Sequence, residues 1–348
     1  MNNPFTKWIS HDIGVDLGTA NTLVYVRGKG VILNEPSVVA VNTKTGRVVA
    51  VGTDARYMIG RTPAHIEAIR PMVDGVISNF EVAEEMIAYF LRKAREEVRG
   101  GRPRIVIGVP SGVTNVERRA AKDAAYNAGA REVHIVEEPM AAAVGIRLPI
   151  FDPVGSMIVD IGGGTTDIAV ISLGGIVRAK NLHIAGDKLN EDIISYVRDE
   201  FKILLGARTA EDVKIAIGSV LNTGAAREST IRGRDLVTGL PREVIITDAD
   251  IREAIAVSLG SLVEAVKEVL ESTPPEVVSD IMHRGILLVG GGALIHGMAE
   301  LLTGELGIPV TAAEDPLTAV VRGTGIILEE FDTFKEILID GDDELRTR

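Results

Sequence analysis

The chain has 348 residues, with 37 Lys and Arg against 49 Asp and Glu, and a formal net charge of −12. Its 46% of hydrophobic residues excludes a largely disordered chain, and its length predicts about two globular domains. The lack of cysteine excludes disulfide frameworks, thiolate zinc sites and cysteine nucleophiles, and the acidic balance argues against broad nucleic-acid binding.

The first ten residues carry an apolar face. Phe5, Trp8 and Ile9 have the spacing i, i+3 and i+4, so they share one side of a short helix, with Lys7 beside them. Such a face next to a cation is typical of an interfacial membrane anchor, which we predict at residues 1–10. The alternative is a terminus that packs on the body of the protein. No apolar run reaches the ~18 residues of a spanning helix, and no signal peptide is visible.

The first half of the chain predicts a β-meander followed by alternating helices and strands. We expect strands at 13–15, 23–26, 31–33, 38–41, 48–51, 105–109 and 133–136. We expect helices at 81–98, after a capping box of Thr114 and Glu117 up to about 129, and at 139–146.

The pattern then restarts. We expect strands at 157–161, 168–172 and 286–289, and helices at 187–205, 210–220, 248–271 and 317–328. This alternation predicts an α/β fold in which helices cover the sheets. The acidic tail at 336–348 is expected to be solvated.

Two segments of the chain share one sequence pattern. Val15-Asp16-Leu-Gly18-Thr19-Ala-Asn21-Thr22-Leu-Val and Val159-Asp160-Ile-Gly162-Gly-Gly164-Thr165-Thr166-Asp167-Ile both run from a strand that ends in Asp, through a glycine turn with polar side chains, into a second strand. Glycines let backbone N–H groups approach phosphate oxygens, and an Asp at a strand end can hold Mg²⁺ through its water shell. We therefore predict two related domains whose hairpins clamp a polyphosphate. Two ordinary hairpins are the alternative.

A third glycine cluster, at residues 290–294, follows the strand at 286–289 and enters a predicted helix. Glycines there let a flat base or sugar lie against the backbone. The alternative is a tight strand-to-helix turn. The sequence has neither a P-loop nor a G-x-G-x-x-G fingerprint, so the predicted nucleotide site is of another kind.

The three glycine motifs, in this order, resemble the actin-like ATPase superfamily, and further motifs narrow the resemblance to the MreB family of bacterial cell-shape proteins. These motifs are Asn34-Glu-Pro-Ser-Val-Val-Ala40, Ile69-Arg-Pro-Met-Val-Asp-Gly-Val-Ile77, Glu137-Glu-Pro-Met-Ala-Ala-Ala-Val-Gly145, Thr273-Pro-Pro-Glu276 and Glu314-Asp-Pro-Leu-Thr-Ala319. The resemblance covers about residues 11 to 330.

The resemblance implies an actin-like ATPase fold, with two related ribonuclease-H-like domains and four subdomains around a nucleotide cleft. The implied limits are 11–33, 66–150 and 316–335 for subdomain IA, 34–65 for IB, 151–183 and 246–315 for IIA, and 184–245 for IIB. The implied function is slow ATP hydrolysis, with ATP or ADP and Mg²⁺ as cofactors. The family forms filaments, often antiparallel pairs, under the inner membrane and guides peptidoglycan synthesis with the cell-wall elongation machinery.

The resemblance also implies roles for single residues. Asp16 and Asp160 would organise Mg²⁺ and its waters, Glu138 would position the attacking water, and Thr165 would place a hydroxyl near it. A carboxylate that polarises water through one contact suits slow phosphoryl transfer, although Glu138 could instead be an acid that stabilises a helix N-terminus. The implied nucleotide ligands are Gly18, Thr19, Ala20, Asn21, Gly162, Gly163, Gly164 and Thr165 at the phosphates, Glu211 and Lys214 at the ribose and adenine, and Gly290, Gly291, Gly292, Ala293 and Leu294 in the adenosine loop.

Two surface features concern partners. The loop at 98–104 lacks the bulky apolar pair by which some family members enter membranes, which shifts the expected lipid contact to Phe5, Trp8 and Ile9. A basic cluster could add contact with anionic lipid or could be a solvated helix end; it comprises Arg92, Lys93, Arg95, Arg99, Arg102 and Arg104. Val116 lies where the family pairs protofilaments laterally, unless its helix turns that residue toward its own sheet.

Other functions on the same fold are a small-molecule kinase, which is the main alternative, a chaperone ATPase and a non-catalytic scaffold. A kinase needs a second pocket and a base for a hydroxyl group, and no insertion supplies them. A chaperone needs a further domain, but only about 20 residues follow the last predicted helix. Both phosphate loops look intact, which counts against a scaffold. The six histidines show no metal-ligand spacing.

Overall fold

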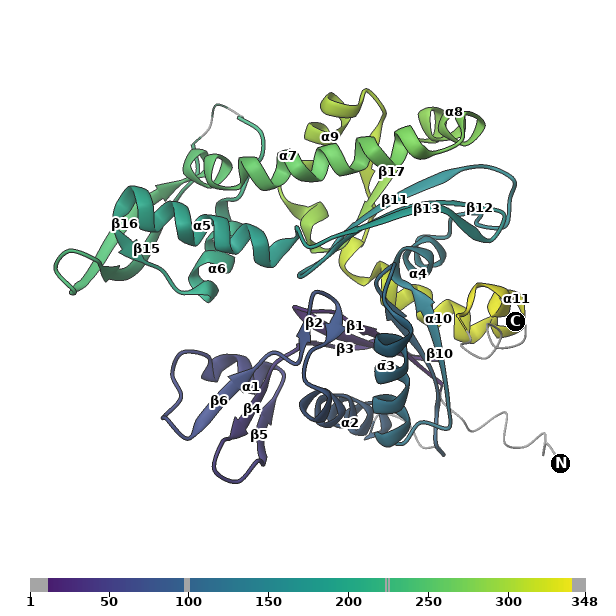
Figure 1. The fold of residues 1–348 in the computed structure, drawn as a ribbon, viewed down its shortest axis with the longest axis horizontal. Coiled ribbons are helices and arrows are strands. Elements are labelled where there is room, and N and C mark those ends of the chain that lie inside the picture. Colours follow the sequence, from purple (N-terminus) through teal and green to yellow (C-terminus); the bar gives the residue numbers. More distant parts are fainter. Residues whose placement is uncertain (1–11, 97–100, 223, 225, 340–348) are drawn as a thin grey trace.

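The computed structural model describes residues 12–96, 101–222, 224 and 226–339. The predicted anchor, with Phe5, Trp8 and Ile9, and the tail from residue 340 lie outside the described residues. Two five-stranded sheets form the centre of the molecule (Figure 1). We call residues 12–150 the first half and residues 151–315 the second half, since each contains one of these sheets.

The sheet of the first half has the strand order β10-β9-β1-β2-β3. Its strands are β1 (Ile13–Leu17), β2 (Asn21–Val26), β3 (Gly30–Pro36), β9 (Arg104–Val109) and β10 (Glu132–Glu137). β1, β2 and β3 are antiparallel neighbours, whereas β9 and β10 continue the sheet parallel to β1. The carboxyl ends of three parallel strands therefore meet at one edge.

The sheet of the second half repeats this arrangement in the order β13-β12-β11-β17-β18. Its strands are β11 (Ser156–Ile161), β12 (Thr166–Ser172), β13 (Gly175–Leu182), β17 (Ile286–Val289) and β18 (Val310–Ala312). An antiparallel meander is again extended by two parallel strands, so the prediction of two related halves is confirmed. The sequence analysis missed β13 because this edge strand is partly exposed along its whole length and carries no apolar run.

Two helices of small residues lie between the sheets (Figure 1). They are α4 (Glu138–Gly145) and α10 (Ala319–Glu329), and α10 follows a single 3₁₀ turn, η3 (Pro316–Thr318). A Cβ atom on Gly145 would lie 1.9 Å from the carbonyl oxygen of Ala319, and one on Gly323 would lie 1.7 Å from that of Ala141. The two backbones therefore touch, and their close packing joins the halves.

The first half also contains a small separate sheet. Its strands β4 (Val39–Asn42), β5 (Val48–Val51) and β6 (Ile66–Ile69) pack with α1 (Thr53–Met58) around a core of Val38, Ala40 and Ala55. The predicted meander is therefore wrong beyond its third strand, because the chain leaves the main sheet after Pro36. Helices α2 (Phe80–Glu96) and α3 (Asn115–Asn127) pack together beside the main sheet, and the capping box at Thr114 is confirmed.

The second half carries its own small sheet, formed by β14 (Ile203–Leu204), β15 (Glu228–Asp235) and β16 (Pro241–Thr247). Helices α5 (Gly186–Phe201), α6 (Ala207–Ile217) and α7 (Asp248–Ser272) surround it. The predicted helix at 187–205 ends at Phe201 because Lys202 turns into the left-handed region, with φ of 58°, and the chain continues as β14. The β15–β16 hairpin, which the sequence analysis missed, forms one end of the long axis (Figure 1).

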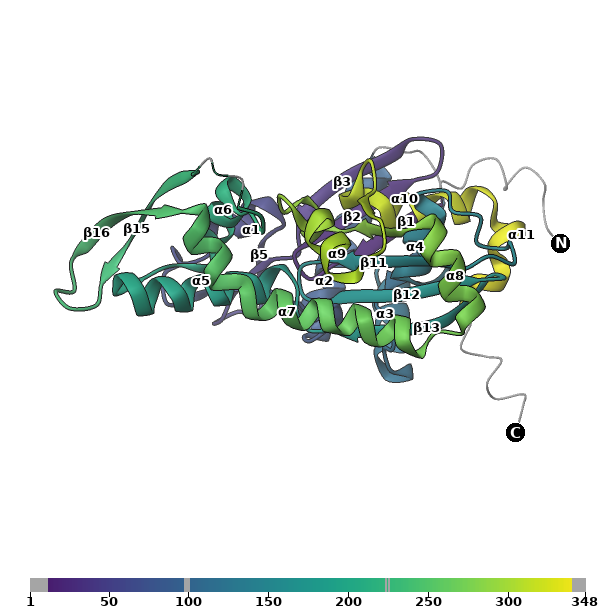
Figure 2. The same ribbon diagram turned by 90° about the horizontal axis from the view of Figure 1, so that it is seen from above.

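The remaining elements are short. They are β7 (Met72–Val73), β8 (Val76–Ile77), α8 (Pro275–Arg284), the 3₁₀ turn η2 (Gly291–Leu294), α9 (Met298–Leu306), α11 (Phe331–Phe334) and the 3₁₀ turn η4 (Lys335–Ile337). Figure 2 shows α8 and the β12–β13 hairpin toward the end of the long axis opposite to β15–β16.

Candidate functional site

Four carboxylates gather where the two central strands end. Asp16 lies in β1 and Asp160 in β11, Glu138 begins α4, and Asp167 lies in β12 directly opposite Asp160. Burial raises the pKa of all four carboxyl groups, and the charges of the three aspartates raise the pKa of Glu138 further. The two predicted Mg²⁺-organising aspartates are thus brought together with the predicted catalytic glutamate.

This cluster lacks charge compensation of its own. Burial raises the pKa of Asp16 to about 7 and that of Asp167 to about 6, even though Asn181 and the backbone of Ser111 donate hydrogen bonds to Asp167. A divalent cation would relieve the repulsion among these groups. Within the described ranges, no three acidic or histidine side chains are arranged to ligate a metal directly. The cluster therefore fits a hydrated Mg²⁺ that is held through its waters.

Asp167 is a site residue that the sequence analysis missed. Its carboxylate is 1% exposed, accepts a 2.8 Å bond from the Ser111 backbone of the first half, and accepts a 2.9 Å bond from Asn181 on β13. The available signal was its place at the end of the second repeat, seven residues after Asp160. The first repeat has Leu23 at the position opposite Asp16, so the comparison of the repeats did not single out Asp167.

The two predicted phosphate loops face one another across the halves. A Cβ atom on Gly163 would lie 2.6 Å from Cβ of Ala20, and one on Gly164 would lie 2.5 Å from Oγ1 of Thr19. Only glycine fits this approach, because any side chain would push the loops apart. The N–H of Gly162 bonds the carbonyl of Thr165 at 2.9 Å, which closes the second loop on itself.

Each loop is also held in place by hydrogen bonds to neighbouring segments. Thr19 Oγ1 accepts a 2.8 Å bond from the N–H of Gly75, and Ser37 donates a 2.6 Å bond to the carbonyl of Gly18. In the second loop, the carbonyl of Gly163 accepts a 2.8 Å bond from the N–H of Asp187 at the start of α5. The loops therefore present fixed backbone groups to any phosphate between them.

Glu211 and Lys214, predicted at the ribose and adenine, lie one helical turn apart on α6. Lys214 is 8% exposed, and its ammonium donates to Glu211 at 2.9 Å and to the carbonyl of Gly186 at 2.8 Å. Although burial opposes it, the Lys214 charge holds the pKa of Glu211 below its usual value. Because Gly186 bonds Gly162, this pair is physically connected to the second phosphate loop.

The adenosine loop at 290–294 differs in one respect from the prediction. It forms the 3₁₀ turn η2 rather than entering an α-helix at once, and α9 begins only at Met298. Gly290 has φ of 78°, and a Cβ atom there would lie 2.4 Å from Oδ1 of Asp160. The loop is thus adjacent to the carboxylate cluster, and its last residue, Leu294, is 57% exposed.

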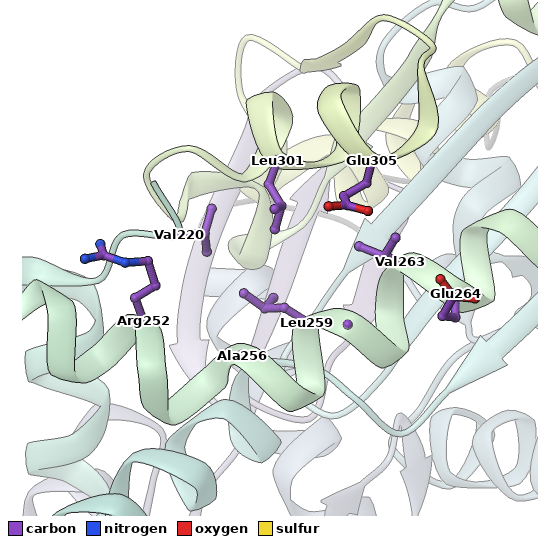
Figure 3. A pocket seen from close by; sticks show the side chains of 9 residues that line it. Val220, Arg252, Ala256, Leu259, Val263, Glu264, Leu301 and Glu305 are labelled. Carbon is purple, nitrogen blue, oxygen red and sulfur yellow. The ribbon is translucent and has the colours of Figure 1, made fainter. Parts of the chain in front are cut away.

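A pocket of about 280 Å³ lies between α7 and α9 (Figure 3). Val220, Leu259, Val263 and Leu301 contribute apolar side chains to it. None of the predicted nucleotide ligands lines it, so it is separate from the site described above.

Comparisons with known proteins agree with this geometry. The sequence matches the MreB/Mbl protein family over residues 10–336. It is 50% identical over 323 residues to the cell shape-determining protein Mbl of Bacillus cereus, covering 93% of this chain and 97% of that protein. The chain belongs to the MreB/Mbl family.

Solved structures extend the comparison. MreB5 of Spiroplasma citri bound to ADP is 40% identical, with a TM-score of 0.89 over 94% of this chain and 98% of that one. The MamK double helical filament is 25% identical, with a TM-score of 0.78 over 91% and 98%. The actin-like ATPase fold predicted from the sequence is thereby confirmed, and the chain is an actin-like cell-shape protein. The alternative of a small-molecule kinase finds no support in these relatives.

Two further surfaces of this MreB/Mbl family member were predicted from the sequence to contact partners. Val116 is 77% exposed on α3, so it faces solvent and not its own sheet. Part of the basic cluster is engaged within the protein, because Lys93 pairs with Glu35 at 2.6 Å and Arg104 with Glu132 at 2.9 Å. No helix among the described residues is both long and apolar enough to span a bilayer.

Proposed function

We propose that this chain binds ATP with Mg²⁺ between its two halves, hydrolyses it slowly and assembles into filaments along the inner face of the cell membrane. The observation that carries the proposal is the pair of facing glycine loops beside four carboxylates of raised pKa. Backbone N–H groups would bind the phosphates, and Mg²⁺ would offset both sets of negative charge. A similar protein, MreB5 of Spiroplasma citri, has been solved with ADP and with AMPPNP.

In this proposal Glu138 and Thr165 act on the attacking water. Glu138 lies among the buried aspartates, and Thr165 is 6% exposed at the end of the second loop. Phosphoryl transfer to water depends mainly on positioning and charge neutralisation, so one carboxylate contact accounts for slow turnover. Glu211, Lys214 and the 290–294 loop would hold the nucleoside. The limits of the four subdomains given above belong to the same proposal.

Exposed apolar residues at both ends of the long axis support self-association. Val237 and Leu240, in and beside the β15–β16 turn, are 82% and 65% exposed, and Leu173 and Met282 at the opposite end are 69% and 57% exposed. A head-to-tail contact between unlike ends does not close, so it yields a filament. The exposed Val116 on α3 would pair two such filaments in antiparallel fashion. MamK, a similar protein, forms a double helical filament.

The membrane part of the proposal rests on the sequence of the first ten residues, together with the basic cluster, of which Arg92 is exposed on α2. Phe5, Trp8 and Ile9 would enter the interface, and the arginines would lie near anionic lipid. The relatives named as cell shape-determining proteins favour cooperation with the cell-wall elongation machinery and peptidoglycan synthesis.

Sedimentation of the purified full chain tests this proposal. The protein is centrifuged with Mg·ATP, with Mg·ADP or without nucleotide, in the presence and absence of anionic vesicles. We expect pelleting that requires Mg·ATP, and vesicle binding that is lost in a variant without residues 1–10 but kept in Val116→Glu. Protein that binds Mg·ATP yet stays soluble over a wide concentration range would contradict the filament proposal. Unchanged vesicle binding after the deletion would contradict the anchor.

A further inference from the structure

Two pairs of polar side chains connect the first half to the second at the rim beside the phosphate loops. Arg70 follows β6 in the first half, and its Nη1 donates to both carboxylate oxygens of Asp187 on α5, at 3.2 and 3.3 Å. Asp74, in the turn between β7 and β8, lies 3.5 Å from Nδ1 of His183, which follows β13. Both pairs join residues more than 100 positions apart, so they form only when the halves approach each other.

Each pair is one step from a phosphate loop. The N–H of Asp187 bonds the carbonyl of Gly163 in the second loop at 2.8 Å, while its carboxylate bonds Arg70. The residue after Asp74 is Gly75, whose N–H bonds Oγ1 of Thr19 in the first loop at 2.8 Å. The second loop is therefore tied to the first half through Asp187, and the first loop is tied to the second half through the Asp74 turn.

The Asp74–Gly75 turn is fixed in its shape. Both residues have positive φ, 51° for Asp74 and 74° for Gly75, and a Cβ atom on Gly75 would lie 2.2 Å from the ring of Pro110. A non-glycine residue with positive φ is uncommon and is held there by its surroundings. The turn is therefore restricted in shape, and it places Asp74 directly beside the Gly75 N–H that bonds the first loop.

We propose that Arg70 and Asp187 are positioning residues for the nucleotide reaction, because their ion pair holds the second phosphate loop in a fixed position relative to the first half. The Asp74–His183 pair in turn holds the first phosphate loop in a fixed position relative to the second half. We call these two pairs the rim latch. Phosphates between the loops and the latch at the rim stabilise the same closed arrangement of the halves, so each strengthens the other. This inference rests on the proposed function, because it needs a nucleotide between the loops.

The expected size of the effect is modest. The side chains of Arg70 and Asp187 are 45% and 32% exposed, so solvent and salt weaken their attraction. Exposed ion pairs change an equilibrium by about two- to fivefold. Loss of the pair should therefore speed nucleotide release by about two- to fivefold without preventing binding.

Release of a fluorescent ATP analogue tests the latch. The purified full chain is loaded with the analogue and Mg²⁺ and chased with excess ATP, for wild type, Arg70→Ala, Asp187→Asn and the double variant. We expect both single variants to release faster and the double variant to match them, because they remove one interaction. Raising the salt concentration should speed release from wild type more than from the variants.

Lys188→Ala is the matched control. Lys188 is the next residue on α5 and pairs with Asp192 at 2.6 Å within the same helix, with 43% exposure of its side chain, but it does not join the halves. Its release rate should equal that of wild type. Equal rates for wild type and both latch variants, or single effects that simply add in the double variant, would overturn the proposal. A wild-type chain that binds no analogue would instead overturn the proposed nucleotide site.

A distance measurement separates positioning from simple destabilisation. Because the chain has no cysteine, Lys44→Cys in the β4–β5 loop and Thr238→Cys in the β15–β16 turn can be labelled with a donor and an acceptor dye. We expect Mg·ATP to shorten this distance in wild type and to do so less in Arg70→Ala, while the melting temperature without nucleotide stays the same. An equal nucleotide-dependent change in both proteins would contradict the latch.

Discussion

Asp160 and Asp167 lie directly opposite each other on adjacent antiparallel strands, and both are buried, at 6% and 1% exposure. Burial raises the pKa of Asp160 most, and the negative charge of Asp167 raises it further. Asp167 is nevertheless held by two hydrogen-bond donors, one of them the Ser111 backbone from the other half. The pair thus combines electrostatic repulsion with a contact that joins the halves, and a bound cation would relieve that repulsion.

Asp167→Asn should have opposite effects on the free and the nucleotide-bound protein. Removing one negative charge relieves repulsion on Glu138 and Asp160, so the melting temperature without Mg²⁺ should rise by a few degrees. The affinity for Mg·ATP should fall about tenfold, since about 1.4 kcal/mol of attraction to the cation is lost. Thermal melting and calorimetric titration measure the two effects. Asp235→Asn should instead lower the melting temperature, because Thr238, Val237 and Arg242 donate hydrogen bonds to that carboxylate and hold its pKa at about 2.

The stability of the nucleotide-free protein should fall as the pH rises from about 4 to 7, between the ordinary and the raised pKa values of these carboxyl groups. The pKa of Asp167 is raised to about 6 and that of Asp16 to about 7, from ordinary values of 3.8. The folded state therefore keeps protons that the unfolded state has lost, and the stabilisation they give disappears as the pH passes through the folded pKa values. Melting curves at intervals of half a pH unit measure this. With saturating Mg·ATP the slope should flatten, and a melting temperature that rises across this range without nucleotide would contradict the account.

Glu138→Gln should separate binding from hydrolysis. The amide keeps the size of the side chain but cannot draw a proton from water, so phosphate release should slow on the order of 10²-fold while the dissociation constant for Mg·ATP stays within about threefold. Single-turnover phosphate release and nucleotide titration give the two numbers. Glu137→Gln, at the end of β10, is the control and should hydrolyse at close to the wild-type rate. An equal loss in both variants would indicate a general disturbance of α4.

Gly163→Ala should abolish tight nucleotide binding. The new methyl group would lie 2.6 Å from Cβ of Ala20, so the two loops must move apart and their N–H groups can no longer reach the same phosphates. Titration with Mg·ATP measures the loss. Gly304→Ala, in the last turn of α9 with nothing within 4 Å of the added atom, should bind normally and gain about 0.5–1 kcal/mol of stability. Normal binding by Gly163→Ala would show that the loops do not clamp the phosphates.

The sequence by itself determined the local structural motifs of this protein. Each repeat consists of an Asp at the end of a strand and a glycine turn. Both features depend only on a few neighbouring residues, so the sequence predicts them. The same holds for the capping box at Thr114 and for the buried strands, whose apolar runs have no other stable place. The order of the motifs along the chain was enough to predict the fold and the family.

The tertiary structure decided what depends on residues that are distant in the chain. It placed Asp167 beside Glu138 and brought Arg70 to Asp187, because these contacts arise only when two separately folded sheets are docked through α4 and α10. It also moved the strands at 39–42 and 48–51 into a sheet of their own, since pairing partners are chosen by packing and not by the pattern within a strand. Local patterns fix which residues can bind a phosphate, whereas docking of the halves fixes how the charges around it are balanced and how the two phosphate loops are held together.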